Sequence, residues 1–154
     1  MSEAVRAPRT TRHLEDIARL VRREAPAPPV AELIGFDVVE IAVGRAVTSL
    51  RVERRHHNPM GTLHGGIVCD LADAAMGMAM ASTLEDDESF TTIDLGAKYF
   101  KPIWNARLRA TAVVVKRTRL LGLMECSVED EAGSLVARLN STCMVLRGEK
   151  ASGR

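Results

Sequence analysis

The feature that most constrains this chain is a stretch over residues 58–83 in which a loop leads directly into one long helix. It reads NPMGTLHGGIVCDLADAAMGMAMAST. Its second part carries apolar residues at alternating spacings of three and four, which is typical of an amphipathic helix. A helix over 65–82 would be about 27 Å long and would cross a small domain.

Two faces of this helix are distinguished by composition. Beside the apolar stripe lies a flank that carries two carboxylates and two glycines. We expect Gly77 on this flank to allow the close approach of another backbone, because glycine inside a helix costs about 1 kcal/mol relative to alanine. The stripe consists of Ile67, Leu71, Ala74, Met78 and Ala81, and the flank of Gly66, Asp70, Asp73, Gly77 and Met80.

The rest of the chain predicts two strands before the helix and four after it. Alternating β-branched and polar residues mark them, and glycine, proline or asparagine lies in several of the turns between them. An antiparallel sheet of about six strands has one apolar face to bury, and only the long helix is able to cover it. We therefore predict an α+β fold in which the sheet wraps around the helix. The predicted strands are 36–43, 46–53, 90–99, 107–117, 121–130 and 135–146.

The length of 154 residues predicts one domain. We place it at residues 31–147. Residues 1–30 are expected to form a tail and a short amphipathic helix over 11–23, with a helical turn over 30–34 just inside the domain, and residues 148–154 a disordered tail.

Charge and composition exclude several classes of protein. With 21 basic and 20 acidic residues and 3% aromatics, the chain lacks the basic excess and the stacking platforms of nucleic-acid-binding proteins. No apolar run is long enough to span a membrane, and the N-terminus has no secretory apolar region. We expect a cytoplasmic protein without membrane or nucleic-acid partners, whose three separated cysteines pack in the core.

The start of the helix is the first candidate for chemistry. The first N–H groups of a helix lack intrahelical partners and favour negative charge. Gly65 and Gly66 would let a ligand approach this backbone, so a developing oxyanion would be stabilised there. The alternative is that the two glycines only permit a tight turn from loop to helix.

Asp73 is the second candidate, as a general base or a nucleophile beside the buried stripe. It could also be a half-exposed residue, and Asp70 is a rival. Gly65 and Asp73 are eight residues apart, about 12 Å along one helix axis, too far to serve one carbon atom together. If both act, Asp73 must come from a second subunit whose helix runs antiparallel.

Three further residues precede the helix. Asn58 is able to donate a hydrogen bond to a carbonyl oxygen, or simply forms a turn with Pro59. His64 would hold the loop or polarise the same carbonyl. His56 and His57 fit no usual metal motif with His64, so we expect no metal.

Basic residues gather in the strands that follow the helix, where they form a solvated face or meet phosphates. Arg117 and Arg119 lie at a turn and are the best candidates for phosphate contacts. The full set is Lys98, Lys101, Arg107, Arg109, Lys116, Arg117 and Arg119.

The central stretch resembles the signature of the PaaI-like group of hotdog-fold acyl-CoA thioesterases, which includes the 4-hydroxybenzoyl-CoA thioesterases. The likeness covers about residues 36–146. It is carried by Asn58, the run Gly61-Thr62-Leu63-His64-Gly65-Gly66, Asp73, the segment Thr91-Thr92-Ile93-Asp94, and Tyr99 with Lys101-Pro102.

This resemblance implies a sheet wrapped around a helix, and dimers that often pair into tetramers with active sites at the dimer interface. It implies that the Gly65 amide and Asn58 polarise a thioester carbonyl, that His64 supports the loop, and that Asp73 of the second subunit activates water or attacks directly. Thr92 would help to place the water or the carboxylate. Coenzyme A, part of the substrate and not a cofactor, would contact residues of 99–104 and 116–121. The substrate-binding set is Gly66, Asp94, Tyr99, Lys101, Pro102, Lys116, Arg117 and Arg119.

Two other functions remain open on the same fold. One is a non-catalytic module that binds acyl-CoA, and the other is a hydratase or dehydratase, which needs a differently placed histidine and acid. The sequence does not identify the acyl group.

Overall fold

The computed structural model describes residues 10–152, and its elements follow the predicted order of two strands, one long helix and four strands. The helices are α1 (Arg12–Val21), α2 (Pro29–Ile34) and α3 (Gly65–Ala81), with 3-10 turns at Arg54–His56 and Gly148–Ala151. The strands are β1 (Phe36–Ala42), β2 (Arg45–Arg51), β3 (Glu88–Tyr99), β4 (Arg107–Arg117), β5 (Leu121–Asp130) and β6 (Leu135–Arg147).

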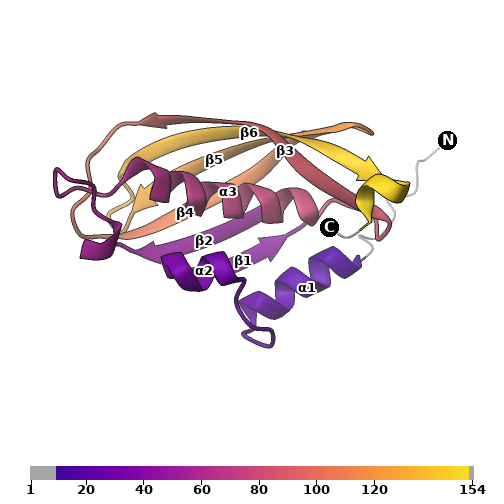
Figure 1. The fold of residues 1–154 in the computed structure, drawn as a ribbon, viewed down its shortest axis with the longest axis horizontal. Helices are drawn as coiled ribbons and strands as arrows, with labels where there is room; N and C mark the ends of the chain where they lie inside the picture. Colours follow the sequence, from indigo (N-terminus) through magenta and orange to yellow (C-terminus); the bar gives the residue numbers. More distant parts are fainter. Residues whose placement is uncertain (1–9, 153–154) are drawn as a thin grey trace.

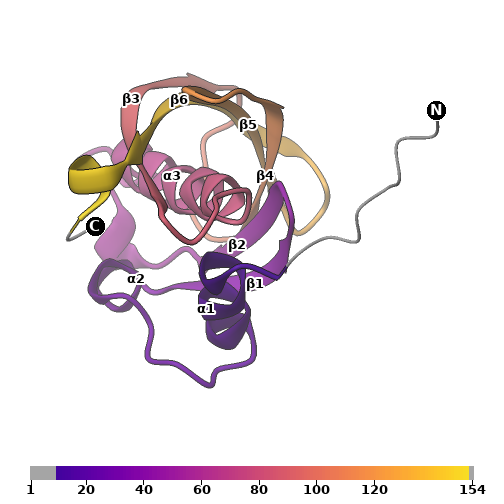
Figure 2. The ribbon, with the colours of Figure 1, turned by 90° about the vertical axis from the view of Figure 1, so that its right-hand side faces the viewer.

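All six strands form one antiparallel sheet in the order β1-β2-β4-β5-β6-β3. The sheet curves around α3, which lies along its concave face (Figures 1 and 2). This is the predicted α+β architecture. The last strand before α3, β2, pairs with β4, and the first strand after it, β3, pairs with β6. Strands from both sides of α3 in the sequence therefore belong to one continuous sheet.

The face of α3 that contacts the sheet differs from the predicted stripe. Leu71 is buried as expected, but Ile67, Ala74, Met78 and Ala81 are only partly buried. Met80, placed on the polar flank by the sequence, is fully buried. The helix is apolar on most of its circumference, so spacing alone does not fix which arc faces the sheet. The buried arc is Val68, Leu71, Ala72, Ala75, Met76, Ala79 and Met80.

The expected close approach of another backbone to Gly77 is not seen within residues 10–152 of the protomer. A Cβ built at Gly77 would lie 3.5 Å from the ring of Phe90 on β3, an ordinary van der Waals distance. Within the described residues, no other backbone approaches this position closely. The neighbour of Gly77 in the protomer is therefore an aromatic side chain.

Both ends of the described segment, residues 10–152, pack against the sheet. The helix α1 begins after Thr11, whose Oγ1 accepts a hydrogen bond from the Leu14 amide, and it packs against β1 (Figure 2). Residues 148–151, which lie in the expected C-terminal tail, form a 3-10 turn that packs against β3 and β6. The expected tail over residues 1–9 and the last two residues lie outside the described range.

No helix of residues 10–152 has the length and apolar character needed to cross a bilayer.

Candidate active site

His64 builds the start of α3. It is the N-cap residue of the helix, and its ring Nδ1 accepts a hydrogen bond of 2.9 Å from the Gly66 amide. Its carbonyl accepts the Ile67 amide at 3.0 Å. The Gly65 amide meets no acceptor among residues 10–152. The Gly66 amide therefore already donates to His64, and the Gly65 N–H is the one left to donate to a ligand.

Tyr99, from the end of β3, closes over this first turn. Its hydroxyl donates to the Gly65 carbonyl at 2.9 Å and lies 3.1 Å from Cys69 Sγ. Burial, and then the contact with Cys69, raise the pKa of Tyr99 to about 12. The hydroxyl therefore stays protonated at neutral pH and remains a donor.

Asn58 organises the loop that precedes the helix. Its Oδ1 accepts the Met60 and Thr62 amides at 2.9 and 3.2 Å, and its Nδ2 donates to Thr62 Oγ1 at 2.9 Å. These contacts are those of a turn-forming asparagine, the alternative that the sequence analysis left open. Because the amide nitrogen carries two hydrogens, one N–H of Asn58 remains for a ligand.

Asp73 lies two turns further along α3, near the middle of β3 and β6. Partial desolvation, and then the charge of Asp70, raise its pKa above the ordinary 3.8 of an aspartate. The side chain is nevertheless exposed in the single protomer. A carboxylate with a raised pKa at the surface of a helix is suited to accept a proton.

Thr92 and Asp73 share a neighbour that the sequence did not single out for the site. Thr92 Oγ1 lies 3.7 Å from Cys143 Sγ. Burial is the main reason that the pKa of Cys143 is raised, and the nearby charge of Asp73 adds to it. Cys143 is opposite Thr92 in the β3–β6 ladder, a pairing that only the strand register reveals.

Asp94 has a structural partner. Strand β3 carries a bulge between Thr92 and Asp94, and the Asp94 carboxylate accepts the Thr142 amide of β6 at 3.1 Å. Its carbonyl accepts the Ser141 hydroxyl at 2.8 Å. Asp94 thus maintains hydrogen bonding between β3 and β6 at the bulge.

An open cavity of about 440 Å³ adjoins the helix start. Gly65, Tyr99, Lys101 and Pro102 all line it, so four of the predicted residues are brought together. Lys101 also forms an ion pair of 2.5 Å with Asp130. The remaining walls are apolar: Leu63, Val68, Phe100, Ile103 and Val136.

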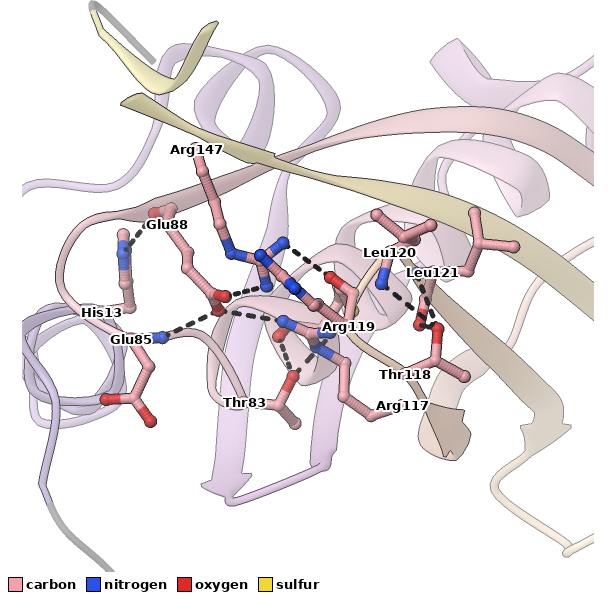
Figure 3. Close-up of polar contacts among 11 residues, drawn as sticks. His13, Thr83, Glu85, Glu88, Arg117, Thr118, Arg119, Leu120, Leu121 and Arg147 are labelled. Carbon is pink, nitrogen blue, oxygen red and sulfur yellow. Dashed lines mark hydrogen bonds and ion pairs between the residues drawn. The ribbon is translucent and has the colours of Figure 1, made fainter. Parts of the chain in front are cut away.

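The predicted phosphate ligand Arg117 is instead part of an ion-pair cluster around Glu88 (Figure 3). Arg117 Nη2 lies 2.9 Å from Glu88 Oε2, and Arg147 pairs with the other carboxylate oxygen. Glu88 is buried and also accepts the Glu85 amide at 3.1 Å. Burial acts to raise the pKa of Glu88, but the Glu85 amide and the two arginines outweigh it and lower the pKa.

The other two basic candidates point elsewhere. Lys116 is exposed on β4, next to a bulge, and Arg119 is exposed in the turn between β4 and β5. The Arg119 carbonyl accepts Arg147 Nη1 at 2.7 Å (Figure 3), which fixes the turn while its own side chain stays at the surface. Glu88 and Arg147 are ion-pair partners that the sequence analysis did not single out.

His56 and His57, which precede α3, form hydrogen bonds with backbone groups. His56 is buried, where its Nδ1 accepts the Glu53 amide and its Nε2 donates to the Ile34 carbonyl at 2.8 Å. His57 donates to the Trp104 carbonyl at 2.7 Å. Among the described residues, no three His, Cys, Asp or Glu side chains gather closely enough to hold a metal ion.

Comparison with known proteins identifies relatives. Residues 18–145 match the family described as a domain of unknown function, DUF4442. The chain is 29% identical to a 1,4-dihydroxy-2-naphthoyl-CoA hydrolase of Listeria monocytogenes over 77% of this chain and 97% of the relative. It is 30% identical to human acyl-coenzyme A thioesterase 13 over 66% of this chain and 73% of the relative.

Solved structures agree with the fold. A substituted form of the phenylacetic acid degradation protein PaaI from Thermus thermophilus is 31% identical, with a TM-score of 0.71, over 76% of this chain and 98% of that one. With its six-stranded sheet wrapped around α3 and its matching segment of 128 residues (18–145), the chain belongs to the DUF4442 family, within the PaaI-like thioesterases of the hotdog fold.

Proposed function

We propose that this protein is an acyl-CoA thioesterase, which converts an acyl-CoA and water into a carboxylic acid and coenzyme A. The observation that carries the proposal is the arrangement on α3: an unoccupied amide at Gly65 beside an apolar cavity, and a carboxylate of raised pKa at Asp73. The names of the relatives, two of them CoA-ester hydrolases, support it.

In the proposed reaction, the thioester carbonyl oxygen accepts hydrogen bonds from the Gly65 amide and from the remaining N–H of Asn58. These donors stabilise the negative charge of the tetrahedral intermediate. Asp73 takes a proton from water, whose oxygen forms the new bond to the carbonyl carbon, and Thr92 helps to place that water. Direct attack by the carboxylate is the alternative route. The carbon–sulfur bond then breaks, and the sulfur takes the proton back from Asp73, so that coenzyme A leaves as a thiol. On the alternative route, water hydrolyses the mixed anhydride that forms on Asp73.

The proposal requires a dimer, because about 12 Å of helix axis separates Gly65 from Asp73 in one chain. Exposed apolar surface is consistent with it. Strand β3 is an edge of the sheet, Ile93 on it is 56% exposed, and Ile67 and Met78 on the outer arc of α3 are only partly buried. Antiparallel association of two such faces would bring each Asp73 toward the Gly65 of the other chain. We propose that these dimers pair into a homotetramer.

Coenzyme A would lie along residues 99–104, with Lys101 and Pro102 at the cavity and with Lys116 and Arg119 toward its phosphates. Arg119 and Lys116 are exposed, whereas Arg117 is already paired with Glu88. We place the enzyme in the cytoplasm, a compartment that keeps thiols such as its three free cysteines reduced.

The test is turnover of a panel of aliphatic and aromatic acyl-CoA esters, followed with a thiol reagent. We expect hydrolysis by the wild type, and a fall in kcat of about 100-fold or more in Asp73→Asn, as for loss of a general base. Asp87→Asn, in an exposed loop, is the matched control and should keep full activity. Tight binding without turnover would instead indicate an acyl-CoA-binding module, and hydration of an enoyl-CoA a hydratase. Full turnover by Asp73→Asn would remove Asp73 from the reaction.

A further inference from the structure

One peptide plane at the start of α3 is held from both sides. The Gly65–Gly66 peptide has its carbonyl bonded to the Tyr99 hydroxyl at 2.9 Å and its N–H bonded to His64 Nδ1 at 2.9 Å. A peptide unit is planar and rigid, so two fixed ends leave it little freedom to rotate. The preceding peptide carries the Gly65 N–H, and it is held at its other end, because the His64 carbonyl accepts the Ile67 amide at 3.0 Å.

The Tyr99 ring also restricts the Gly65 backbone sterically. A Cβ added at Gly65 would lie 3.0 Å from the Tyr99 hydroxyl oxygen and 3.1 Å from the ring carbon that bears it. Such distances are shorter than nearly all real Cβ contacts. Glycine at this position is therefore explained by the close approach of Tyr99, in addition to any approach by a ligand.

The direction of each hydrogen bond follows from the partners. The Gly65 carbonyl only accepts, so the single Tyr99 proton goes to it, and the Cys69 thiol at 3.1 Å is left to donate to the Tyr99 oxygen. The hydrogen bond from the Tyr99 hydroxyl to the Gly65 carbonyl therefore does not need the thiol.

We infer that Tyr99 is a positioning residue for the Gly65 amide: its hydroxyl, together with His64, holds the first peptide of α3 so that the Gly65 N–H points at the reacting carbonyl. This inference rests on the proposed function and goes beyond it, since it assigns to Tyr99 a role through the backbone that a contact with coenzyme A alone would not give. The required geometry is within one protomer and does not depend on the dimer.

The experiment compares Tyr99→Phe with Cys69→Ala. The first removes the hydroxyl and keeps the ring, and the second removes only the thiol that contacts the same hydroxyl. We expect Tyr99→Phe to lower kcat about tenfold with KM within about twofold of the wild type, because a transition-state donor is misaligned while ground-state binding is kept. Cys69→Ala should keep kcat within about twofold.

Amide hydrogen exchange at Gly66, whose N–H donates to His64, is measured by NMR and does not require turnover. We expect faster exchange at Gly66 in Tyr99→Phe than in the wild type, and exchange unchanged elsewhere in α3. Unchanged exchange at Gly66 overturns the inference. So does a raised KM with unchanged kcat, which is the signature of a substrate contact, or an equal loss of kcat in Cys69→Ala.

The proposed function and the role of Tyr99 can be refuted independently of each other. If the wild type hydrolyses none of the acyl-CoA esters, the proposed function fails, while the exchange measurement still decides whether Tyr99 holds the Gly65 peptide. If the wild type is active and Tyr99→Phe matches it in kcat and in exchange, only the role of Tyr99 fails.

Discussion

Asp73 and Gly65 lie on the same helix, α3, eight residues apart, so that about 12 Å of helix axis separates the carboxylate from the amide. A reacting carbon has to be about 3 Å from both groups at once. If both groups act in the proposed reaction, one protomer supplies either group to a given site, and never both. This relationship gives the sharpest prediction for the assembly.

Mixed oligomers of two impaired variants should regain activity. Asp73→Asn lacks the base, and Gly65→Ala should displace the Gly65 amide, because its Cβ would lie 3.0 Å from the Tyr99 hydroxyl oxygen. In a dimer of one Asp73→Asn chain and one Gly65→Ala chain, one of the two sites holds a native Gly65 and a native Asp73. Random mixing should restore about one quarter of the wild-type activity, measured on the total purified protein after co-expression. Co-expression of Asp73→Asn with Asp73→Ala is the control and should restore none. Activity that stays at the level of the parents contradicts a shared site.

The raised pKa of Asp73 predicts a gain in stability when the charge is removed. For an acid, a folded-state pKa above the unfolded value means that the folded state holds the proton more tightly. Stability from this group is then present below the ordinary pKa of 3.8 and is lost as pH rises through the raised folded value. Asp73→Asn should therefore melt at a higher temperature than the wild type at neutral pH.

The measurement for Asp73 is Tm against pH for wild type and variant. The difference should shrink to zero below the ordinary pKa of aspartate, where both side chains are neutral. Asp87→Asn, an exposed loop change, should show no such trend. A lower Tm for Asp73→Asn at neutral pH would contradict the prediction.

Glu88 should behave in the opposite way. Its carboxylate is buried and paired with Arg117 and Arg147, so Glu88→Gln leaves two guanidinium groups without their charge partner. We expect a loss of about 3 kcal/mol in the free energy of unfolding at neutral pH, measured by urea denaturation. Because the folded pKa is lowered, this contribution is present above the ordinary 4.5 and is lost as pH falls through the lowered value.

The control for Glu88 is Glu125→Gln, on the exposed face of β5. That change should alter the free energy of unfolding by less than about 0.5 kcal/mol. Equal, small effects of the two substitutions would show that the Glu88 cluster does not stabilise the fold.

Arg117 and Arg119 are only two residues apart but should have different roles. Arg119→Ala should raise KM for an acyl-CoA about fivefold, as for loss of one charge-assisted contact to phosphate, with little change in Tm. Arg117→Ala should lower Tm, because its partner Glu88 is only 8% exposed. Steady-state kinetics with acyl-CoA and with acyl-pantetheine, which lacks the nucleotide phosphates, separates the two roles. A KM effect of Arg119→Ala that persists on acyl-pantetheine would refute a phosphate contact.

Local sequence patterns predicted the helices and strands well, because the interactions that form these elements join residues close in the sequence. The strands 107–117 and 121–130 have the predicted bounds, and the turn at Gly44, with its positive φ of 72°, follows from residue type. The predicted arc of α3 was wrong for the opposite reason. Alanine and methionine occur on nearly every side of this helix, so the arc that faces the sheet depends on strands distant in sequence.

The site shows the same division. The motif from Asn58 to Gly66 and the carboxylate at Asp73 were visible in the sequence, and the structure brings Gly65, Tyr99, Lys101 and Pro102 to one cavity. Nothing local indicates that Arg117 is paired with Glu88, 29 residues away, or Arg147 with the same residue, 59 residues away. Those pairings follow from strand order, since the start of β3 lies near the ends of β4 and β6.

The sequence alone thus determined the order of elements, the α+β class and the residues that carry the family likeness, because periodicity, turn residues and motif spacing are properties of neighbouring residues. Only the tertiary structure decided which arc of α3 is buried, which arginine is left at the surface, and that Tyr99 of β3 holds the Gly65 peptide. These contacts join residues that are brought together by sheet register and by the curvature of the sheet around α3, and neither is encoded in any single stretch.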